Sequence, residues 1–371
     1  MDDASQIQAA PRVPLPQCQK RMQDIMVARR TRTAMHVLLL AAPAVGCKTP
    51  AGRSTARPDN FIFFGQERER ITESSFLENR QVVGCQIKYT WRELEPERDH
   101  YEFGALLKDL AFLERHGKRL FVQLQDVSFG ADVPVPTYLQ KDPGFSGGAD
   151  RKYEYEGEDE SKEKFDGWVA RRWDPAVRAR FIKLLDALGN QVDGRIEGIC
   201  LPETAIGMSE TSKQRPAGFT YQGYVDGLKE TMTAAHKAFP RSCVIEYANF
   251  MPGEFLPWND RGYLRAIYAH ANRTGVGVGG PDLLPHRKPQ LNHSLPLIEA
   301  RRPTIPAGLA VQDGNLEDIN PATGKPVTVE ELYRFAKDRL RLTYIFWGTQ
   351  EPFYSRDILP FIRGLGQHDV R

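Results

Sequence analysis

Acidic side chains close several apolar, strand-like runs of this sequence, and they are the residues best suited to acid–base chemistry. Glu203 follows the run at 196–202, and Asp313 follows the run at 307–312. A carboxylate at the end of an apolar strand is costly unless it is solvated, paired or used in a reaction. Glu203 is therefore our first candidate for a catalytic residue, with Asp313 as its partner.

The identity of the second carboxylate depends on strand register. A shift of one residue turns a side chain to the opposite face of a strand, so either Gln312 or Asp313 points inward. With Asp313 inward, the chain has a nucleophile or a base for water, and with Gln312 inward the pair is broken. Glu246 and Glu351, on or after two other strand-like runs, are the alternatives.

Motifs for nucleotides and metal ions are absent or incomplete. The glycine-rich stretch 275–282 contains Pro281 and opens no helix, so we interpret it as a tight strand. ATGKPVT at 322–328 lacks the first glycine of a phosphate loop, because Ile319 holds that position. No histidine lies in an HExxH pattern, and the cysteines lack zinc-site spacing. We expect neither a metal nor a cofactor.

The amino-acid composition of the chain limits the kinds of partner that it is expected to bind. The chain has 371 residues, 41% of them hydrophobic, which suits a large globular domain. Its 50 Lys and Arg against 48 Asp and Glu give a net charge of +2. Such a balance creates no field that would gather nucleic acid or an anionic membrane, so a neutral partner fits better. The oligomeric state does not follow from these numbers.

Residues 1–47 have the pattern of an export signal. Basic residues precede an apolar run too short to span a bilayer, and small residues then lead to Cys47. This ending resembles the lipobox of bacterial lipoproteins, in which the cysteine is acylated, and it implies that Met26 is the true start. A cleaved signal of a periplasmic or secreted protein is the alternative. Residues 48–58 form a polar linker.

Strand-like runs alternate with amphipathic helical segments over 59–371, a pattern typical of an α/β fold with a parallel sheet. This pattern predicts a (β/α)8 TIM barrel with an enlarged loop after strand 3, at 127–172. A doubly wound sheet is the alternative, but no glycine-rich turn follows the first strand. The eight predicted strands lie at 61–65, 82–88, 119–125, 196–202, 243–249, 275–280, 307–312 and 343–348.

Residues 82–125 carry a recognisable combination of motifs. A strand runs into Trp91, an LEP turn follows at 94–96, and YEF at 101–103 precedes a helix. This unit resembles the second strand, helix and third strand of retaining barrel glycoside hydrolases of the cellulase, mannanase and β-galactosidase type. The proline of the LEP turn ends the extended segment that follows the strand, because its ring fixes φ and its nitrogen cannot donate a backbone hydrogen bond.

The resemblance implies a site in which one carboxyl group protonates the glycosidic oxygen and a second attacks or activates water. In these families the acid/base Glu ends the fourth strand, which is Glu203 here, and the nucleophile ends the seventh, at Gln312 or Asp313. The family usually has Asn before the acid/base, where this chain has Pro202. Asn249, which ends the fifth strand, is the candidate to supply that contact to the sugar.

Aromatic and polar residues at other strand ends are candidates for substrate binding. Trp347 corresponds to the family's floor tryptophan, and aromatic faces stack on the apolar face of a sugar ring. The full set of predicted binding residues is Trp91, Gln125, Asn249, Asp282, Trp347 and Glu351.

Taken together, the sequence patterns and the resemblance imply an exported retaining glycoside hydrolase that acts on a neutral oligo- or polysaccharide. Its only membrane contact would be a lipid at Cys47. The alternative is a non-catalytic, carbohydrate-binding surface lipoprotein with a degenerate site. A barrel enzyme of another chemistry would need a lysine or a metal cluster at the strand ends, and Lys88 is the inward lysine candidate.

Overall fold

The computed structural model describes residues 57–155, 163–208 and 215–366. The predictions for the signal region 1–47, for Cys47 and for most of the linker 48–58 lie outside these residues. Across the described ranges, none of the helices combines the length and the apolar character that crossing a membrane requires.

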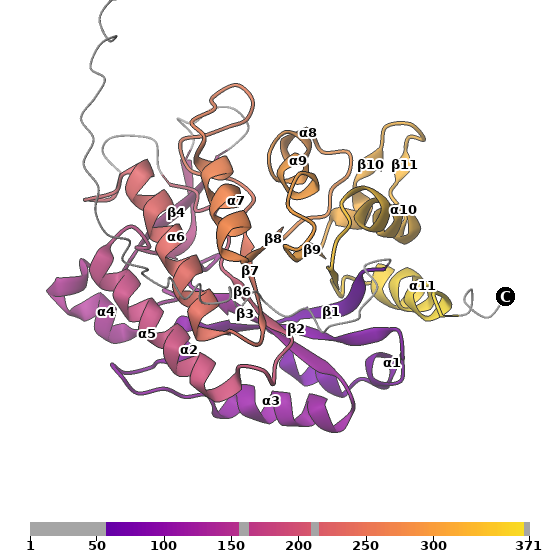
Figure 1. The fold of residues 1–371 in the computed structure, drawn as a ribbon, viewed down its shortest axis with the longest axis horizontal. Helices are drawn as coiled ribbons and strands as arrows, with labels where there is room; N and C mark the ends of the chain where they lie inside the picture. Colours follow the sequence, from indigo (N-terminus) through magenta and orange to yellow (C-terminus); the bar gives the residue numbers. More distant parts are fainter. Residues whose placement is uncertain (1–56, 156–162, 209–214, 367–371) are drawn as a thin grey trace, which may run out of the picture. The chain divides into compact units, whose positions relative to one another are not determined.

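Eight parallel strands close into a barrel, as the sequence predicts (Figure 1). Each predicted strand is present, and the first pairs with the last to complete the ring. In order around the barrel the strands are β1 (Asp59–Gly65), β12 (Tyr344–Trp347), β9 (Ala307–Val311), β8 (Gly277–Gly280), β7 (Cys243–Tyr247), β6 (Gly198–Leu201), β3 (Arg119–Gln125) and β2 (Val82–Thr90).

Helices connect the strands, and local signals in the sequence explain where they begin and end. Asp174 caps α5 by accepting a hydrogen bond from the backbone N–H of Ala176 at 2.9 Å. Gly275 ends α7 with φ 88°, a left-handed conformation that favours glycine. The main helices are α3 (Gly104–Arg115), α5 (Pro175–Val192), α6 (Tyr221–Ala238), α7 (Tyr263–Thr274), α9 (Ser294–Glu299), α10 (Val329–Arg334) and α11 (Leu359–Gly364).

Side chains of the barrel strands alternate between the barrel interior and the helical layer. Phe61, Phe121 and Phe346 meet inside the barrel, with ring centroids 5.0 to 5.9 Å apart. Gly308 leaves room for this packing, since a Cβ there would lie 2.7 Å from the ring of Phe346. Trp347, the next residue along β12, packs in the outer core instead. Aromatic rings therefore fill the interior.

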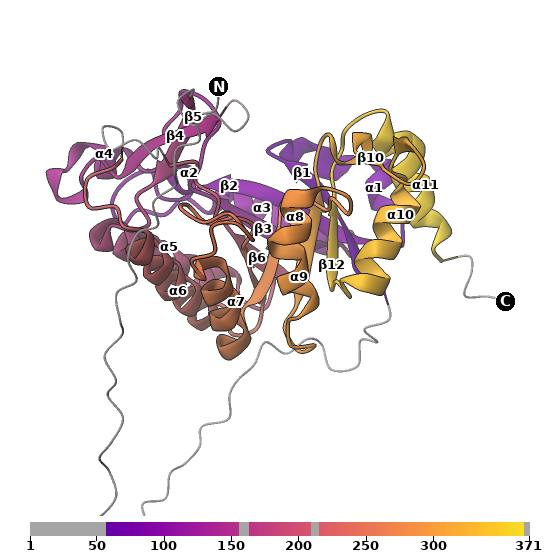
Figure 2. The same cartoon turned by 90° about the horizontal axis from the view of Figure 1, so that it is seen from above.

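The chain makes an excursion between β3 and α5, where the sequence predicts an enlarged loop. It forms α4 (Thr137–Lys141) and a hairpin of β4 (Ala149–Tyr155) and β5 (Glu163–Ala170), seen at the upper left of Figure 2. Residues 156–162 of this hairpin lie outside the described ranges. The backbone N–H of Ser128 donates to the carbonyl of Trp168 at 2.8 Å. This bond attaches the hairpin to the carboxyl end of β3.

Candidate active site

Glu203 lies two residues beyond β6, at the carboxyl end of the fourth barrel strand. Asn249, two residues beyond β7, donates a hydrogen bond from Nδ2 to Oε2 of Glu203 at 3.0 Å. The orientation of this amide is defined because its Oδ1 accepts from the backbone N–H groups of Ala205, at 3.2 Å, and Phe250, at 2.9 Å. Two of the predicted site residues are thus in direct contact.

The surroundings of Glu203 favour its protonated form. Burial raises the pKa of this half-buried carboxyl group, and the negative charge of Asp282 raises it further. The hydrogen bond from Asn249 and the positive charges of Lys88 and Arg172 lower this pKa, but the net effect is an increase. A carboxyl group that keeps its proton to higher pH is suited to protonate a leaving group.

Asp282 brings a second carboxylate close enough to affect Glu203. It lies two residues beyond β8, the sixth strand, and its Oδ1 accepts from Nδ2 of Asn315 at 3.0 Å. Burial raises the pKa of Asp282, and the hydrogen bond from Asn315 lowers it, with a net increase. The sequence identifies Asp282 only as a binding residue, and its position at a strand end was the signal for a further role.

The other two surface candidates for the second carboxylate occupy loops. Asp313 is exposed after β9, and its carboxylate makes no hydrogen bond or ion pair with the described part of the chain. Glu351 is also exposed, and its Oε2 accepts from the backbone N–H of Ser355 at 3.3 Å. Asp282, at the end of the sixth strand, is thus the partly buried carboxylate whose charge raises the pKa of Glu203.

Glu246 faces the helical layer rather than the barrel opening. Its neighbours Ile245 and Tyr247 belong to the interior cluster, and side chains alternate along a strand. Glu246 is 1% exposed, and its Oε1 has no hydrogen-bond partner within the described ranges. It lines a small pocket together with Asp126 and Arg172. This orientation removes Glu246 from the candidates for the second carboxylate.

Glu246→Gln is expected to stabilise the protein at neutral pH. Burial raises the pKa of Glu246 to about 8, although the positive charge of Arg172 opposes the shift. At pH values between the ordinary carboxyl pKa and this raised pKa, the folded chain holds a proton that the unfolded chain has released. The free energy of unfolding of the wild type therefore falls as pH rises, by up to about 1.4 kcal/mol per pH unit.

The glutamine does not titrate, so the advantage of the variant should grow with pH. Urea unfolding of both proteins, near pH 5 and near pH 8, measures this difference. The same pH dependence in wild type and Glu246→Gln would show that the carboxyl group of Glu246 does not titrate in this way.

The two tryptophans predicted to bind sugar are core residues in the structure. Trp347 is 0% exposed, and its Nε1 donates to Oδ1 of Asn60 at 2.9 Å. Trp91 is 1% exposed, and its Nε1 donates to Oε2 of Glu95 at 2.9 Å. Both pack between the barrel strands and the helices, so neither ring offers a face to a ligand. The predicted binding role does not fit these positions.

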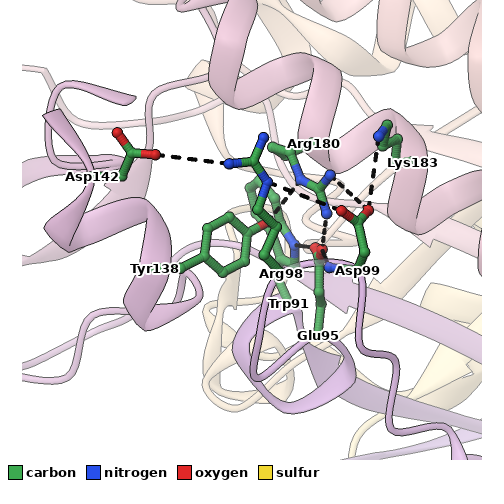
Figure 3. Close-up of polar contacts among 8 residues, drawn as sticks. All are labelled: Trp91, Glu95, Arg98, Asp99, Tyr138, Asp142, Arg180 and Lys183. Carbon is green, nitrogen blue, oxygen red and sulfur yellow. Dashed lines mark hydrogen bonds and ion pairs between the residues drawn. The ribbon is translucent and has the colours of Figure 1, made fainter. Parts of the chain in front are cut away.

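The LEP turn leads into a buried ion pair (Figure 3). Glu95 is 0% exposed, and its Oε1 accepts from Nη2 of Arg180 and from the backbone N–H of Asp99. Arg180 also donates from Nη1 to Asp99, at 2.8 Å, and from Nε to the hydroxyl of Tyr138, at 2.9 Å. The motif that carries the sequence resemblance therefore attaches the loop after β2 to α5 and α4.

A cleft of about 660 Å³ opens at the carboxyl ends of the first barrel strands. Gln125, one of the predicted binding residues, lines it together with Lys88. Phe129, which is 64% exposed, adds an aromatic surface to the same wall. Glu203 is not among the residues that line this cleft, but its charge raises the pKa of Lys88 against the effect of burial.

The described ranges contain no group of three or more His, Cys, Asp and Glu side chains placed to hold a metal ion. Cys85 and Cys200 are buried, and burial raises the pKa of both thiols. Inert, buried thiols of this kind are typical of packing residues.

Comparison with known proteins identifies the fold. No family model and no curated protein matches the chain. The catalytic domain of β-amylase from Paenibacillus polymyxa matches with a TM-score of 0.51 and 8% identity, over 79% of this chain and 92% of that chain.

Two further solved structures match with lower scores. A GH10 endoxylanase retrieved from a sugarcane soil metagenome has a TM-score of 0.46 and 15% identity, over 79% of this chain and 86% of that chain. GH5_18 from Streptomyces cattleya, in complex with GlcNAc, has a TM-score of 0.48 and 13% identity, over 80% of this chain and 71% of that chain. The chain therefore has a (β/α)8 barrel fold, which it shares with the β-amylase catalytic domain.

Proposed function

We propose that this chain is a glycoside hydrolase whose general acid and base is Glu203. One observation supports this most directly: a half-buried carboxyl group with a raised pKa, hydrogen-bonded by Asn249, ends the fourth barrel strand. Cleavage of a glycosidic bond needs such a proton donor beside a second carboxylate. The fold shared with a β-amylase catalytic domain supports the same class of reaction.

A hydrolysis screen over aryl glycosides and polysaccharides tests this proposal. We expect the wild type to hydrolyse at least one of them, and Glu203→Gln to lose that activity. A folded wild-type protein that hydrolyses no member of a broad panel would count against the proposal.

Asp282→Asn is expected to lower kcat by about 10²-fold or more, whereas Asp313→Asn keeps most of the activity. The reason is that Asp282 is partly buried and acts on Glu203, while Asp313 is exposed to solvent. Asparagine keeps the shape of each side chain and removes only the charge, so the two variants are matched. Loss of activity in Asp313→Asn alone would place the second carboxylate on the seventh strand, as the sequence resemblance implies.

We propose retention of the anomeric configuration, which the sequence resemblance also implies. Retaining enzymes hold their carboxyl groups about 5–5.5 Å apart, and the second group is the nucleophile. Inverting enzymes leave room for a water, at about 6.5–9.5 Å. Proton NMR of the first sugar released distinguishes the two outcomes, and release of the opposite anomer would mean inversion.

A carbohydrate-binding surface protein without turnover is the second candidate. The exposed position of Asp313 favours it, because the resemblance expects a nucleophile at the end of the seventh strand. Saccharide binding that is equally tight in wild type and in Glu203→Gln, with no hydrolysis in either, would support this candidate.

We also propose export of the chain as a cell-envelope lipoprotein acylated at Cys47, with a periplasmic or secreted location as the alternative. The proposal rests on the sequence of 1–47, which lies outside the described residues. Incorporation of labelled palmitate that is lost in Cys47→Ser is the measurement that tests it.

A further inference from the structure

Two cations in the wall of the cleft lack a direct ion-pair partner among the described residues. Lys88 and Arg92 both line it, and neither side chain forms a hydrogen bond or an ion pair with the described residues. The nearby Lys152 differs, because its ammonium group is paired with the carboxylate of Asp166. The wall therefore carries two cations without an ion pair, against the single carboxylate of Asp132 that also lines the cleft.

Lys88 points into the barrel opening. Gln86, two residues earlier on β2, donates to the hydroxyl of Tyr247 in the interior at 3.0 Å, and residues two apart share a face of a strand. Nζ of Lys88 lies 5.2 Å from the ring centroid of Phe63, another interior side chain. The ammonium group thus stands above the aromatic interior, within the electrostatic range of Glu203.

The charge of Lys88 is costly in this position. Burial lowers the pKa of the lysine, and the negative charge of Glu203 opposes that effect. When Glu203 holds a proton, as a general acid must, this negative charge is absent. A partly buried ammonium group without a counter-charge is unfavourable, and a ligand that carries a negative charge would relieve the cost.

We propose that this cleft binds saccharides that carry a uronic acid carboxylate, and that Lys88 and Arg92 receive it. Arginine presents a planar fork that matches a carboxylate, and lysine adds a compact charge. Gln125 and Thr90 line the same cleft and suit sugar hydroxyls, while the exposed ring of Phe129 suits the apolar face of a sugar. The inference rests on the proposed function and names its substrate class.

The overall charge of the chain does not argue against an acidic ligand. The net charge of +2 is spread over 371 residues, whereas recognition depends on the few charges that line the cleft. A sulfate ester would meet the same two cations, so the experiment includes sulfated saccharides as a separate arm.

Titration calorimetry on Glu203→Gln tests the inference without consuming the ligand. The ligands are oligosaccharides of glucuronic, galacturonic and mannuronic acid, each with its carboxyl-reduced neutral counterpart, and sulfated neutral oligosaccharides. We expect at least one uronate to bind about 10- to 100-fold more tightly than its neutral counterpart. The preference should weaken as ionic strength rises.

Variants of Lys88 and Arg92 test whether these two side chains cause the preference for uronates over neutral saccharides. Lys88→Met and Arg92→Gln should each remove most of it, and Lys88→Arg should restore part of it. Lys108→Met, at an exposed lysine of α3 outside the cleft, is the matched control and should leave the preference unchanged. The melting temperature of Lys88→Met should not fall, because the variant removes an unpaired charge.

Several outcomes overturn the inference: no uronate binds, uronates and their neutral counterparts bind equally, or the preference survives in the Lys88→Met/Arg92→Gln double variant. A general preference for sulfate esters over uronates also overturns it. A wild-type protein that binds uronates through both residues but hydrolyses nothing contradicts the proposed function alone. A protein that hydrolyses neutral saccharides without preferring uronates contradicts this inference alone.

Discussion

Glu203→Gln is expected to lower kcat about 10²- to 10⁴-fold on any substrate that the wild type hydrolyses. The amide keeps the size of the carboxyl group but cannot transfer a proton to the leaving oxygen. Asn249 holds this side chain at the end of β6 through a 3.0 Å hydrogen bond, so the substitution changes the chemistry more than the geometry. Initial rates at saturating substrate measure the effect.

The pH profile gives an independent readout of the same residue. Burial raises the pKa of Glu203, so the protonated acid persists above the ordinary carboxyl range. The wild-type rate should therefore decline on the alkaline side, as pH passes through this raised pKa and the proton donor is lost. In Glu203→Gln this alkaline decline should disappear from any residual activity.

The control for Glu203→Gln is its stability. Burial already disfavours the charged form of Glu203, so a neutral amide should not lower the free energy of unfolding at neutral pH. Activity at the wild-type rate in a folded variant would remove Glu203 from the acid/base role.

The barrel itself was predictable because its strands are short apolar runs separated by amphipathic helices. Parallel strands buried on both faces give such runs, so their number and order follow from the sequence. The eight predicted strands match the closed barrel in the structure. Glu203 was predictable for a related reason, since any residue that ends a barrel strand lies at its carboxyl-terminal opening.

The direction of a side chain on a strand was harder to predict. In β12, Phe346 belongs to the interior cluster and Trp347 to the outer core, although both are aromatic and buried. Glu246 likewise faces outward between two inward neighbours on β7. A run that is apolar on both faces shows no alternation of polar and apolar residues, so the sequence does not reveal which side chains point inward. An error of one residue exchanges the two faces.

The position of the second carboxylate depends on the geometry of the loop after its strand. The pattern of apolar residues along a strand does not predict this geometry. Asp282 and Asp313 both lie two residues beyond a barrel strand, but Asp282 is partly buried and its charge raises the pKa of Glu203, whereas Asp313 is exposed. After β9 the backbone N–H of Asn315 donates to the carbonyl of Gln312 at 3.1 Å, which closes a tight turn. Asp313 lies at the exposed tip of this turn, so an equal offset from the strand does not give an equal direction.

Arg180→Met is expected to lower the free energy of unfolding by about 3–5 kcal/mol, the largest stability effect that the structure predicts. Arg180 and Glu95 are 4% and 0% exposed at their side chains, and they form the ion pair in Figure 3. Methionine fills much of the volume but leaves the carboxylate of Glu95 buried without its charged partner. Urea unfolding with a two-state fit measures the loss.

Matched variants distinguish the stability contribution of the buried Glu95–Arg180 pair from that of its exposed neighbour Asp99. Asp99 is 55% exposed and also contacts Arg180, so Asp99→Asn should cost far less, as is usual for surface ion pairs. The double variant Glu95→Leu/Arg180→Met should recover much of the stability lost in Arg180→Met, because replacing both charges leaves no uncompensated group. If Arg180→Met unfolds at the same urea concentration as the wild type, the carboxylate of Glu95 must find water or another donor. The motif that carries the sequence resemblance would then contribute little to the stability of the fold.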